Sequence, residues 1–470
     1  MELTRLVAES AGLSVSHAAG DINGVEVTSI AYDSRAVQPG ALYVCVPGHV
    51  ADGHDFAAAA VERGAVALIV EHELPIAVPQ VVVDDARVAM ALASAAFNGH
   101  PSSALTVVGV TGTNGKTTTV HFLEAIFRAH GWAVGVIGTL TGARTTPEAP
   151  DLQRQLAAWR DAGVDAVAME VSSHALVLHR VDGTRFAVAV FTNLSRDHLD
   201  FHGTMERYFE AKARLFTPSF ADRAVVNAED PHGRLLLDAA QIPTVPYSIA
   251  DVSDLRLAPS KSTFTWRGEH VRVPIGGRHN VVNALAAATA AAELGVAVPA
   301  ISVGIGNAGP VPGRFEPIEE GQPFSVVVDY AHTPDGLERV LEAAREVAAG
   351  HRVVLVFGAG GDRDRTKRPA MGAAAGTGAD VAILTSDNPR SEDPAAIIAE
   401  VARGAPADAL VIEADRRRAI ARAFATARPG DVVVIAGKGH ESTQTIGDQV
   451  LPFDDRVVAR EELSRMGEGR

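Results

Sequence analysis

The stretch that most constrains this chain is Val107-Val-Gly-Val-Thr-Gly-Thr-Asn-Gly-Lys-Thr-Thr-Thr119, an apolar run that ends in a glycine-rich loop. The pattern of an amphipathic helix follows it, in His121-Phe-Leu-Glu-Ala-Ile-Phe127. A strand, a glycine-rich loop and a helix in this order are typical of a phosphate-binding site, because glycine lets the backbone approach a phosphate and a helix N-terminus attracts anions. The stretch therefore predicts an α/β domain built around a bound nucleotide.

The residues inside this loop have the chemistry that a nucleotide site needs. Gly112 and Gly115 give the backbone access to a phosphate, Lys116 supplies a cation, and the hydroxyl of Thr117 or Thr118 can bind Mg²⁺. The spacing is irregular, because the fifth position before Gly115 is not glycine. The alternative is an ordinary glycine-rich turn before a helix. The flanking strand and helix favour the phosphate loop.

Length and composition narrow the class of protein. A chain of 470 residues is expected to form about three domains. With 47% hydrophobic and 21% charged residues, it has the composition of a soluble α/β protein. A formal net charge of −15 argues against a nucleic-acid-binding surface, and no apolar stretch is long enough to span a bilayer. With a single cysteine, Cys45, and no apolar signal sequence, we expect a cytoplasmic protein without membrane insertion.

Shifts in the pattern divide the chain into three expected domains. Residues 1–102 alternate short strands and helices, with a strand at 40–48, a helix at 56–63 and a strand at 66–70. Residues 103–313 contain the phosphate loop and end in a Pro/Gly-rich stretch. Residues 314–470 alternate strands and helices throughout, which predicts a parallel, doubly wound sheet.

In this third block we expect strands at 324–328, 353–357, 381–385, 411–412 and 432–435, and helices at 334–348, from about 367, at 394–402 and at 416–427. Polar loops follow four of these strands. Because the carboxyl ends of parallel strands lie at one edge of a sheet, where ligands bind, the loops predict a single site. They are Asp329-Tyr-Ala-His-Thr333, Gly358-Ala-Gly-Gly-Asp-Arg-Asp364, Ser386-Asp-Asn-Pro-Arg390 and Gly437-Lys-Gly-His-Glu441.

Two strands of the second block also end in polar residues. Glu170 ends the run that begins at Asp165, and Thr192-Asn-Leu-Ser-Arg-Asp-His-Leu-Asp200 follows the strand expected at 186–191. The same argument from parallel strands predicts that both segments face the nucleotide.

Lys212 is the most informative single residue, because it falls on an apolar helix stripe. A helix is expected from near Thr204, and its stripe contains Met205, Tyr208, Phe209, Leu215 and Phe216. A buried lysine is costly unless it is paired or chemically altered. The alternative, which composition alone favours, is a lysine at the edge of the stripe whose ammonium reaches solvent. The nearby Asp197-His198 weakens that alternative, because it predicts an oxygen-rich metal site.

Some polar segments have two interpretations. Asn280 and Asn283 fall in the first turn of an Ala-rich helix that ends near Leu294, and they can cap the helix, which is the commoner use, or contact a nucleobase. Asp33-Ser-Arg35 and the segment 47–53 are most often turns, and the alternative is the edge of a ligand site.

Five motifs, in order along essentially the whole chain, resemble those of the Mur ligases, the ADP-forming amino-acid ligases of peptidoglycan synthesis. The resemblance implies three α/β domains: a small UDP-binding domain, a central P-loop ATPase-like domain, and a C-terminal doubly wound Rossmann-like domain that binds the amino acid. The motifs are Thr111-Gly-Thr-Asn-Gly-Lys-Thr117, Glu170-Val-Ser-Ser-His174, Asn193-Leu-Ser-Arg-Asp-His-Leu-Asp200, Asp329-Tyr-Ala-His-Thr-Pro334 and Gly437-Lys-Gly-His-Glu441.

Within the family, Asp387-Asn-Pro-Arg390 is similar to the motif of members that select meso-2,6-diaminopimelate over L-lysine. The resemblance thus implies an ATP-dependent ligase that adds meso-2,6-diaminopimelate to the D-glutamyl γ-carboxylate of UDP-MurNAc-L-Ala-D-Glu through an acyl phosphate. Its partners would be these small molecules alone, and we expect a monomer. The alternatives are the same ligase with L-lysine or another diamino acid, a folylpolyglutamate synthetase-like ligase, and a nucleotide-dependent binding protein without turnover.

The resemblance also implies a role for individual positions. The UDP-substrate contacts would be Ser34, His49, Val50, Ala51, Thr145, Thr146, Ser172 and Arg180. The ATP contacts would be Gly112, Thr113, Asn114, Gly115, Lys116, Thr117, Thr118, Asn283, Arg314 and Asp329. The diaminopimelate contacts would be Arg363, Asp387, Asn388, Pro389, Arg390, Gly437 and Glu441. The chain departs from the family at Leu178, where relatives often carry a glutamine that contacts the UDP substrate.

The same resemblance implies two Mg²⁺ ions and a modified lysine. The catalytic residues would be Lys116, Glu170, His198 and Lys212, and the metal ligands Thr117, Glu170, His198 and Lys212, the last as a carbamylated side chain. A carbamate presents anionic oxygens, which are the ligands that Mg²⁺ takes, whereas an ammonium would repel the ion.

Overall fold

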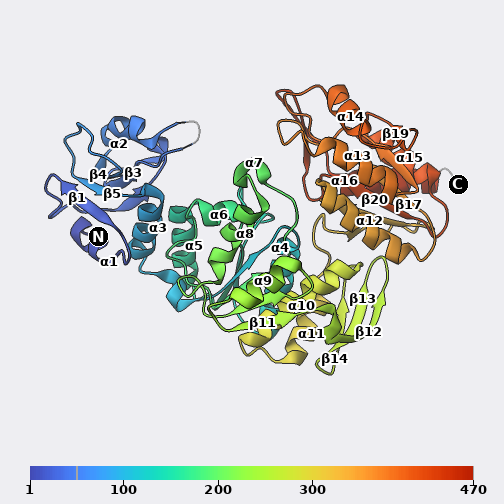
Figure 1. Cartoon of the computed structure of the whole chain (residues 1–470), viewed down its shortest axis with the longest axis horizontal. Coiled ribbons are helices and arrows are strands. Elements are labelled where there is room, and N and C mark those ends of the chain that lie inside the picture. The colour runs from blue at the N-terminus through green and yellow to red at the C-terminus, as the bar shows by residue number, and fades with distance from the viewer. Residues whose placement is uncertain (49–50, 469–470) are drawn as a thin grey trace.

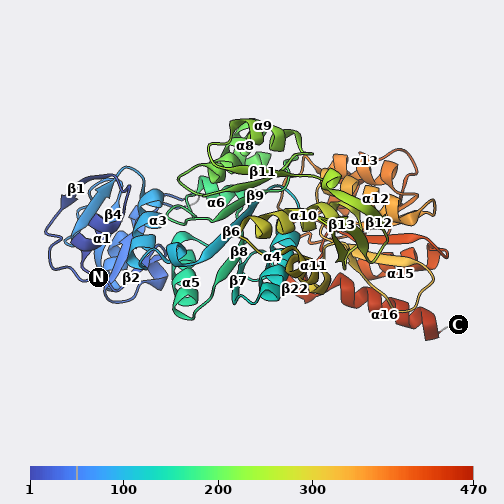
Figure 2. The same ribbon diagram turned by 90° about the horizontal axis from the view of Figure 1, so that it is seen from below.

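The structure is a computed structural model that describes residues 1–48 and 51–468. Three α/β units follow one another along its long axis, from the N-terminal unit through a middle unit to the C-terminal unit (Figures 1 and 2). Each unit has a sheet of its own with helices packed on it. No helix in the described part of the chain is long and apolar enough to cross a membrane.

The N-terminal unit is built on a five-stranded sheet in the order β1-β5-β4-β3-β2. Its strands pair in parallel except for β1, which runs antiparallel to β5. The strand expected at 40–48 is shorter, and the expected helix 56–63 and strand 66–70 correspond to α2 and β4. The elements are α1 (Leu3–Glu9), β1 (Val15–Ala19), β2 (Ser29–Ala31), β3 (Ala41–Val44), α2 (Ala57–Glu62), β4 (Ala65–Val70), β5 (Gln80–Val83) and α3 (Ala86–Phe97).

The middle unit contains a six-stranded, all-parallel sheet in the order β11-β10-β9-β6-β8-β7. The strand before the phosphate loop, β6, lies between β9 and β8, so three carboxyl ends meet at the loop. The elements are β6 (Thr106–Thr111), α4 (Lys116–His130), β7 (Val134–Ile137), α5 (Ala149–Asp161), β8 (Ala166–Glu170), α6 (Ser173–Val177), β9 (Val188–Phe191), α7 (Leu199–His202), α8 (Met205–Ala213), β10 (Ala224–Asn227), α9 (Pro231–Ala239) and β11 (Thr244–Tyr247).

A small antiparallel sheet, β12-β13-β14, follows within the same unit and was not predicted from the sequence. Two helices pack beside it, α10 and α11, of which α10 is the expected Ala-rich helix (Figure 2). The elements are β12 (Val252–Leu257), β13 (Ser262–Trp266), β14 (Glu269–Val273), α10 (Arg278–Glu293) and α11 (Val298–Asn307).

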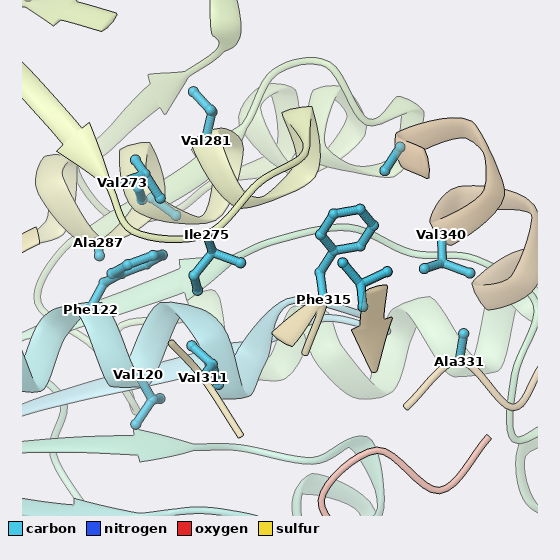
Figure 3. Close-up of a cluster of buried hydrophobic side chains, with 14 of the residues drawn as sticks. Val120, Phe122, Val273, Ile275, Val281, Ala287, Val311, Phe315, Ala331 and Val340 are labelled. Atoms are coloured by element: carbon cyan, nitrogen blue, oxygen red, sulfur yellow. The ribbon is translucent and has the colours of Figure 1, made fainter. Parts of the chain in front are cut away.

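Helix α4, which begins at the phosphate loop, is fixed by dense packing. Phe122 is fully buried, and Figure 3 shows it among Ile275 and Ala287. Burial of a phenylalanine side chain is worth about 2–3 kcal/mol. Helix α11 approaches α4 closely at Gly304, where a Cβ atom would lie 2.4 Å from Ile126 Cα. The start of α4, and so the loop before it, therefore has little freedom to move.

The same apolar cluster continues into the C-terminal unit. Phe315 is fully buried and lies near Ile275 of the middle unit and Val340 of α12 (Figure 3). A shared core of this kind orients one unit on the other.

The C-terminal unit has a six-stranded sheet in the order β15-β16-β20-β17-β18-β19. All its pairs are parallel except β15 with β16, so the predicted parallel sheet is confirmed with a short antiparallel edge added. The predicted strands and helices are all present, while β15, the hairpin β21–β22 and α16 were not predicted. The elements are β15 (Glu316–Pro317), β16 (Ser325–Asp329), α12 (Pro334–Ala348), β17 (Val353–Phe357), α13 (Arg368–Gly378), β18 (Val381–Leu384), α14 (Pro394–Ala402), β19 (Leu410–Ile412), α15 (Arg416–Thr426), β20 (Val432–Ala436), β21 (Thr443–Ile446), β22 (Gln449–Pro452) and α16 (Asp455–Glu468).

Candidate active site

The phosphate loop joins β6 to α4, and two of its positions accept only glycine. Gly112 has φ 147° and Gly115 has φ 87°. A Cβ atom would lie 1.9 Å from Thr192 Oγ1 at Gly112, and 2.3 Å from Asn283 Oδ1 at Gly115. The glycines therefore permit close packing against two neighbouring segments, as well as the approach of a phosphate to the backbone.

The segment after β9 holds this loop in place. Thr113 N donates to Asn193 O at 2.9 Å, and Asn114 N donates to Asn193 Oδ1 at 3.0 Å. Thr192 Oγ1 donates to Asn114 O at 2.6 Å, and Ser195 N donates to Thr113 Oγ1 at 3.0 Å. The two segments meet because β6 and β9 are parallel neighbours, which is the arrangement that the polar strand ends predicted.

Glu170 ends β8, the other neighbour of β6, and is 1% exposed. Its Oε1 accepts hydrogen bonds from Thr117 Oγ1 at 3.0 Å and from Thr139 N at 2.8 Å. A Cβ atom at Gly138 would lie 2.5 Å from the same oxygen. A carboxylate and a hydroxyl thus lie together at the first turn of α4, and both are ligands that a hard cation takes.

Two lysines donate to one backbone oxygen beside this carboxylate. Lys116 Nζ lies 2.8 Å from Gly112 O, and Lys212 Nζ lies 2.9 Å from the same atom. Lys212 is 1% exposed, so the alternative of a lysine that reaches solvent is wrong. Burial lowers the pKa of both lysines, and the charge of Lys116 lowers the pKa of Lys212 further. Both effects favour the uncharged form of Lys212 more than in an exposed lysine.

His198 stands before α7 with a left-handed backbone, φ 54°, and its ring contacts His174 edge-on at a centroid distance of 4.8 Å. Desolvation lowers the pKa of His198 to about 4, although Asp197 opposes the shift. The imidazole is thus neutral at neutral pH, which is the form that binds metals. Within residues 1–48 and 51–468, no cluster of three or more His, Cys, Asp and Glu side chains could hold a metal ion; the predicted ligand set also includes Thr117 and Lys212.

A cavity of about 740 Å³ lies between the phosphate loop and the C-terminal unit. In its wall the Arg314 guanidinium lies over the Tyr330 ring, 4.3 Å from the centroid. Asp329 accepts hydrogen bonds from Phe315 N at 2.7 Å and Ala331 N at 2.8 Å, and burial raises its pKa. The predicted site residues that line the cavity are Thr113, Asn114, Gly115, Lys116, Thr117, Thr118, Thr145, Glu170, His198, Asn283, Arg314 and Asp329.

Three residues predicted to contact the UDP substrate gather at the end of β8. Thr146 Oγ1 donates to Glu170 O at 2.9 Å, and Ser172 N donates to Thr146 Oγ1 at 3.1 Å. Arg180 Nη1 donates to Thr146 O at 3.3 Å. Thr145, the residue before Thr146, shares a hydrogen bond with the hydroxyl of Thr139 at 3.0 Å. Thr146 thus contacts the backbone of Glu170, and Thr145 is linked to its carboxylate through Thr139, whose hydroxyl donates to Glu170 Oε2 at 3.3 Å.

The other predicted UDP contacts lie in the N-terminal unit. Ser34 begins a short 3₁₀ turn that Asp33 caps, and Ala51 is exposed. The predictions for His49 and Val50 lie outside the described residues. No hydrogen bond in the described part of the chain joins Ser34 or Ala51 to the group at the end of β8.

Glu148, which lies beside Arg180, was not predicted from the sequence. Glu148 is 7% exposed, and its Oε1 pairs with Arg180 Nη2 at 2.8 Å and with Arg144 Nη1 at 3.3 Å. Its Oε2 is buried without a hydrogen-bond partner among the described residues. In the sequence, Glu148 stands three positions after Thr145, a predicted UDP-substrate contact. An acidic residue just before a helix is common, so this position did not stand out.

The predicted diaminopimelate contacts form a second cluster at the carboxyl ends of β17, β18 and β20. Asn388 Nδ2 donates to Glu441 Oε2 at 2.7 Å, and burial raises the pKa of Glu441. Arg390 has a left-handed backbone, φ 53°, and its Nη1 donates to Gly361 O at 2.6 Å. Gly437 has φ 117°, and a Cβ atom there would lie 2.4 Å from Asp387 Oδ2. Pro389 lies within this cluster, and Arg363 is exposed beside it.

Three family models match consecutive parts of the chain. They are described as Mur ligase family, catalytic domain (residues 26–104), Mur ligase middle domain (110–291) and Mur ligase, glutamate ligase domain (313–439). The UDP-N-acetylmuramoyl-L-alanyl-D-glutamate--2,6-diaminopimelate ligase of Geobacillus thermodenitrificans is 46% identical, over 93% of this chain and 94% of its own length. The chain belongs to the Mur ligase family.

Other relatives agree. A ligase of the same name from Streptomyces avermitilis is 47% identical, over 94% of this chain and 93% of its own. A solved structure with that name is 34% identical, with a TM-score of 0.69 over 98% of this chain and 99% of the other. The expected three-domain α/β fold is confirmed, and this Mur ligase is an ADP-forming amino-acid ligase of peptidoglycan synthesis.

In this Mur ligase a single carboxylate ties the C-terminal unit to the phosphate loop. Asp335 lies in the first turn of α12, and its Oδ2 accepts from Ser195 Oγ at 2.6 Å and from Asn114 Nδ2 at 3.2 Å. Arg339 Nε donates to the same oxygen at 3.0 Å. Asp335 was not predicted from the sequence, because an acidic residue in the first turn of a helix is already favoured by the helix dipole.

Asp335→Ala is expected to weaken the docking of the C-terminal unit about tenfold. A hydrogen bond to a charged group contributes about 1.5–3 kcal/mol, and the 27% exposure of this side chain places the effect at the lower end. Energy transfer between fluorophores on the middle and C-terminal units would measure the shift. Glu319→Ala removes an exposed acid of the C-terminal unit that does not line the cavity and serves as the control; equal shifts in the two variants would contradict the assignment.

Proposed function

We propose that this chain joins meso-2,6-diaminopimelate to the D-glutamyl γ-carboxylate of UDP-N-acetylmuramoyl-L-alanyl-D-glutamate, with conversion of ATP to ADP and phosphate. The observation that carries the proposal is the 46% identity over 93% of the chain to a ligase of that name. The same likeness disfavours a folylpolyglutamate synthetase-like activity. A ligase that uses L-lysine stays the principal alternative, and the acceptor assay below tests it.

The reaction has two chemical steps. An oxygen of the γ-carboxylate attacks the γ-phosphorus of ATP, the bond from that phosphorus to the bridging oxygen breaks, and an acyl phosphate and ADP form. The amine of diaminopimelate then attacks the acyl carbon, the carbon–oxygen bond to phosphate breaks, and the new amide nitrogen loses a proton. The first step needs cations near the phosphates, and the second needs the amine to be held close to the acyl carbon.

The phosphate loop supplies the first requirement. The Lys116 ammonium donates to Gly112 O and Thr113 O, so it is already directed along the inside of the loop. We propose that ATP phosphates take over these hydrogen bonds. A fixed cation in a buried site stabilises the charge that develops on a transferring phosphoryl group.

The site contains residue types that suit Mg²⁺. Thr117 and Glu170 offer oxygens 3.0 Å apart, and His198 offers a neutral imidazole. Lys212 as an ammonium does not fit, because it would repel the ion, whereas a carbamate on its nitrogen would supply oxygens. We propose that Thr117 binds one ion, and that Glu170, His198 and carbamylated Lys212 bind the second. Bound Mg²⁺ would neutralise negative charge on the phosphates.

Carbamylation is chemically accessible at Lys212. The lone pair of an uncharged Nζ attacks the carbon of CO₂, a nitrogen–carbon bond forms, one carbon–oxygen double bond becomes an anionic oxygen, and the nitrogen releases a proton. Only the uncharged amine can react, and burial favours that form here. The burial that makes Lys212 costly as an ammonium therefore favours its modification.

The cluster around Asn388 and Glu441 would hold the incoming amino acid. Glu441 and Asp387 offer carboxylates to an ammonium group, and Arg390 offers a planar guanidinium that can bind a carboxylate with two hydrogen bonds. Diaminopimelate carries a carboxylate at its far end and L-lysine does not, so Arg390 would discriminate between them.

We also propose the domain limits 1–102, 103–313 and 314–470, with linkers near 102 and 313 that act as hinges. The enzyme would act as a monomer in the cytoplasm. The cavity between the middle and C-terminal units supports a hinge near 313.

The proposed reaction predicts phosphate release only when ATP, the UDP-linked dipeptide and an acceptor are all present. With equal concentrations of meso-diaminopimelate, L-lysine and L-ornithine, we expect the tripeptide product to contain meso-diaminopimelate. Mass spectrometry of the product and a phosphate assay would measure both. Release of phosphate without the dipeptide, or preferred incorporation of lysine, would reject the proposal in its present form.

Lys212→Ala should lower kcat by at least about 10²-fold, the usual cost of losing one electrostatic stabiliser. Added bicarbonate should not restore activity, because the attachment point of the carbamate is gone. Intact-mass measurement should find the mass of one CO₂ on the wild type and none on the variant. Lys261→Ala removes an exposed lysine and should keep full activity. Normal turnover of Lys212→Ala would show that the lysine has only a structural role.

Arg390→Lys should raise KM for diaminopimelate about tenfold or more, because an ammonium cannot replace the bidentate guanidinium. KM for the UDP-linked dipeptide should change little, since Arg390 lies in the other cluster. Steady-state kinetics with each substrate varied would test this. Arg403→Lys, at a side chain that is 73% exposed, is the matched control. A parallel rise in both KM values would place Arg390 outside the amino-acid site.

A further inference from the structure

Two loops carry the arginines of the diamino-acid site, and a third arginine outside both loops connects them. The first loop, residues 358–364, contains Arg363, and the second, residues 386–392, contains Arg390. Arg368, the first residue of α13, is among the largest fully buried side chains, with 0% exposure. No ligand contact is proposed for Arg368 above.

Arg368 bonds to each loop directly. Its two terminal nitrogens donate to the two carboxylate oxygens of Glu392, at 2.9 and 2.7 Å, which is a bidentate ion pair. Nη2 also donates to Gly360 O at 3.1 Å, and Nη1 donates to Glu400 Oε2 of α14 at 2.7 Å. One guanidinium thus holds a backbone oxygen of the first loop, a carboxylate of the second loop and a helix.

Further hydrogen bonds run between the two loops. Asp362 N donates to Glu392 Oε1 at 2.7 Å, and Ser391 Oγ donates to Asp362 Oδ1 at 2.7 Å. Gly361 N donates to Asn388 O at 2.9 Å. The loops are in such close contact that a Cβ atom at Gly361 would lie 1.8 Å from Pro389 O. Displacement of one loop would therefore displace the other.

This network ends at the Arg390 side chain. Arg390 Nη1 donates to Gly361 O, which is next in the chain to the oxygen that Arg368 holds. The left-handed backbone of Arg390 is costly for a residue with a side chain and persists only where its surroundings fix it. A shift of the first loop would thus move the Arg390 guanidinium.

We propose that Arg368 is a positioning residue for the diamino-acid site, and that it fixes the distance between the loops that carry Arg363 and Arg390. The inference rests on the proposed function of those two arginines. Lysine cannot replace Arg368, because a single ammonium cannot reach Glu392 with two parallel hydrogen bonds and also reach Gly360 O. The effect is on the geometry of the acceptor site, and not on the phosphate loop.

The same unit offers a control for the loss of an arginine–carboxylate pair. Arg352 donates to Asp431 Oδ2 through Nε at 3.1 Å and through Nη2 at 2.6 Å. This pair lies at the amino ends of β17 and β20, at the edge of the sheet opposite the two loops. Arg352→Lys therefore weakens an arginine–carboxylate pair at the opposite edge of the sheet, away from the acceptor site.

The experiment compares Arg368→Lys with Arg352→Lys in the full-length enzyme. We expect Arg368→Lys to raise KM for the acceptor that the wild type uses at least tenfold, with KM for ATP and for the UDP-linked dipeptide within twofold. Arg352→Lys should leave all three KM values within twofold, although both variants lose thermal stability. Equal changes in the acceptor KM, or no change in either variant, would overturn the proposal.

Ser391→Ala keeps the test decisive if Arg368→Lys does not fold. It removes only the exposed hydrogen bond to Asp362 and should raise the acceptor KM in the same selective way, about two- to threefold. Hydrogen exchange of residues 358–364 should accelerate in both variants; unchanged exchange and an unchanged acceptor KM would overturn the proposal. Because the wild type is assayed first, a failure to use diaminopimelate rejects the proposed function separately, and the variants are then tested with whichever acceptor it uses.

Discussion

The hydrogen bonds between the phosphate loop and residues 192–195 are the contact on which the rest of the site depends. They fix the backbone of Thr113 and Asn114 from a neighbouring strand, so the loop does not rely on a bound nucleotide for its shape. Because β6 lies between β8 and β9, the same arrangement brings Glu170 to the other side of the loop. The order of three parallel strands thus brings together the phosphate loop, the Glu170 carboxylate and residues 192–195, which hold the loop.

Charge is the second constraint. Lys116 and Lys212 donate to one carbonyl oxygen, at 2.8 and 2.9 Å, so their nitrogens lie within about 6 Å of each other. Two ammonium charges at about 5 Å repel by roughly 3 kcal/mol at an effective dielectric constant near 20. A neutral hydrogen bond contributes about 1 kcal/mol, so the shared carbonyl does not offset this repulsion. This repulsion favours an uncharged or chemically altered form of one lysine, and burial together with the charge of Lys116 lowers the pKa of Lys212.

The sequence predicted the parts of this structure that depend on local pattern. The strands and helices of the C-terminal unit follow from buried Val/Ile runs alternating with amphipathic stretches, and the meeting of polar strand ends follows from parallel topology. The sheet β12–β14 and the hairpin β21–β22 were not predicted, because several of their strands lack a buried apolar run: no residue of β12 is fully buried, and β22 is exposed along its whole length. The roles of Asp335, Glu148 and Arg368 were not predicted for another reason. Each acts through partners distant in sequence, and each occupies a position where its residue type is ordinary.

The two clusters of the site differ in how they are held, and the reaction explains the difference. Phosphoryl transfer needs a backbone cradle of fixed shape, and the phosphate loop has one supported by β9 and by the packed helix α4. In the proposed reaction, amide formation needs an amine that arrives in the right place after the acyl phosphate has formed, and the proposed acceptor site lies on a separate unit with its own network of loops. These two rigid parts meet at Asp335 and at the apolar contact around Phe315. Alignment of the amine with the acyl carbon therefore depends on that junction as much as on either cluster, since an error of about 1 Å in the position of a reacting group can cost about 10²-fold in rate.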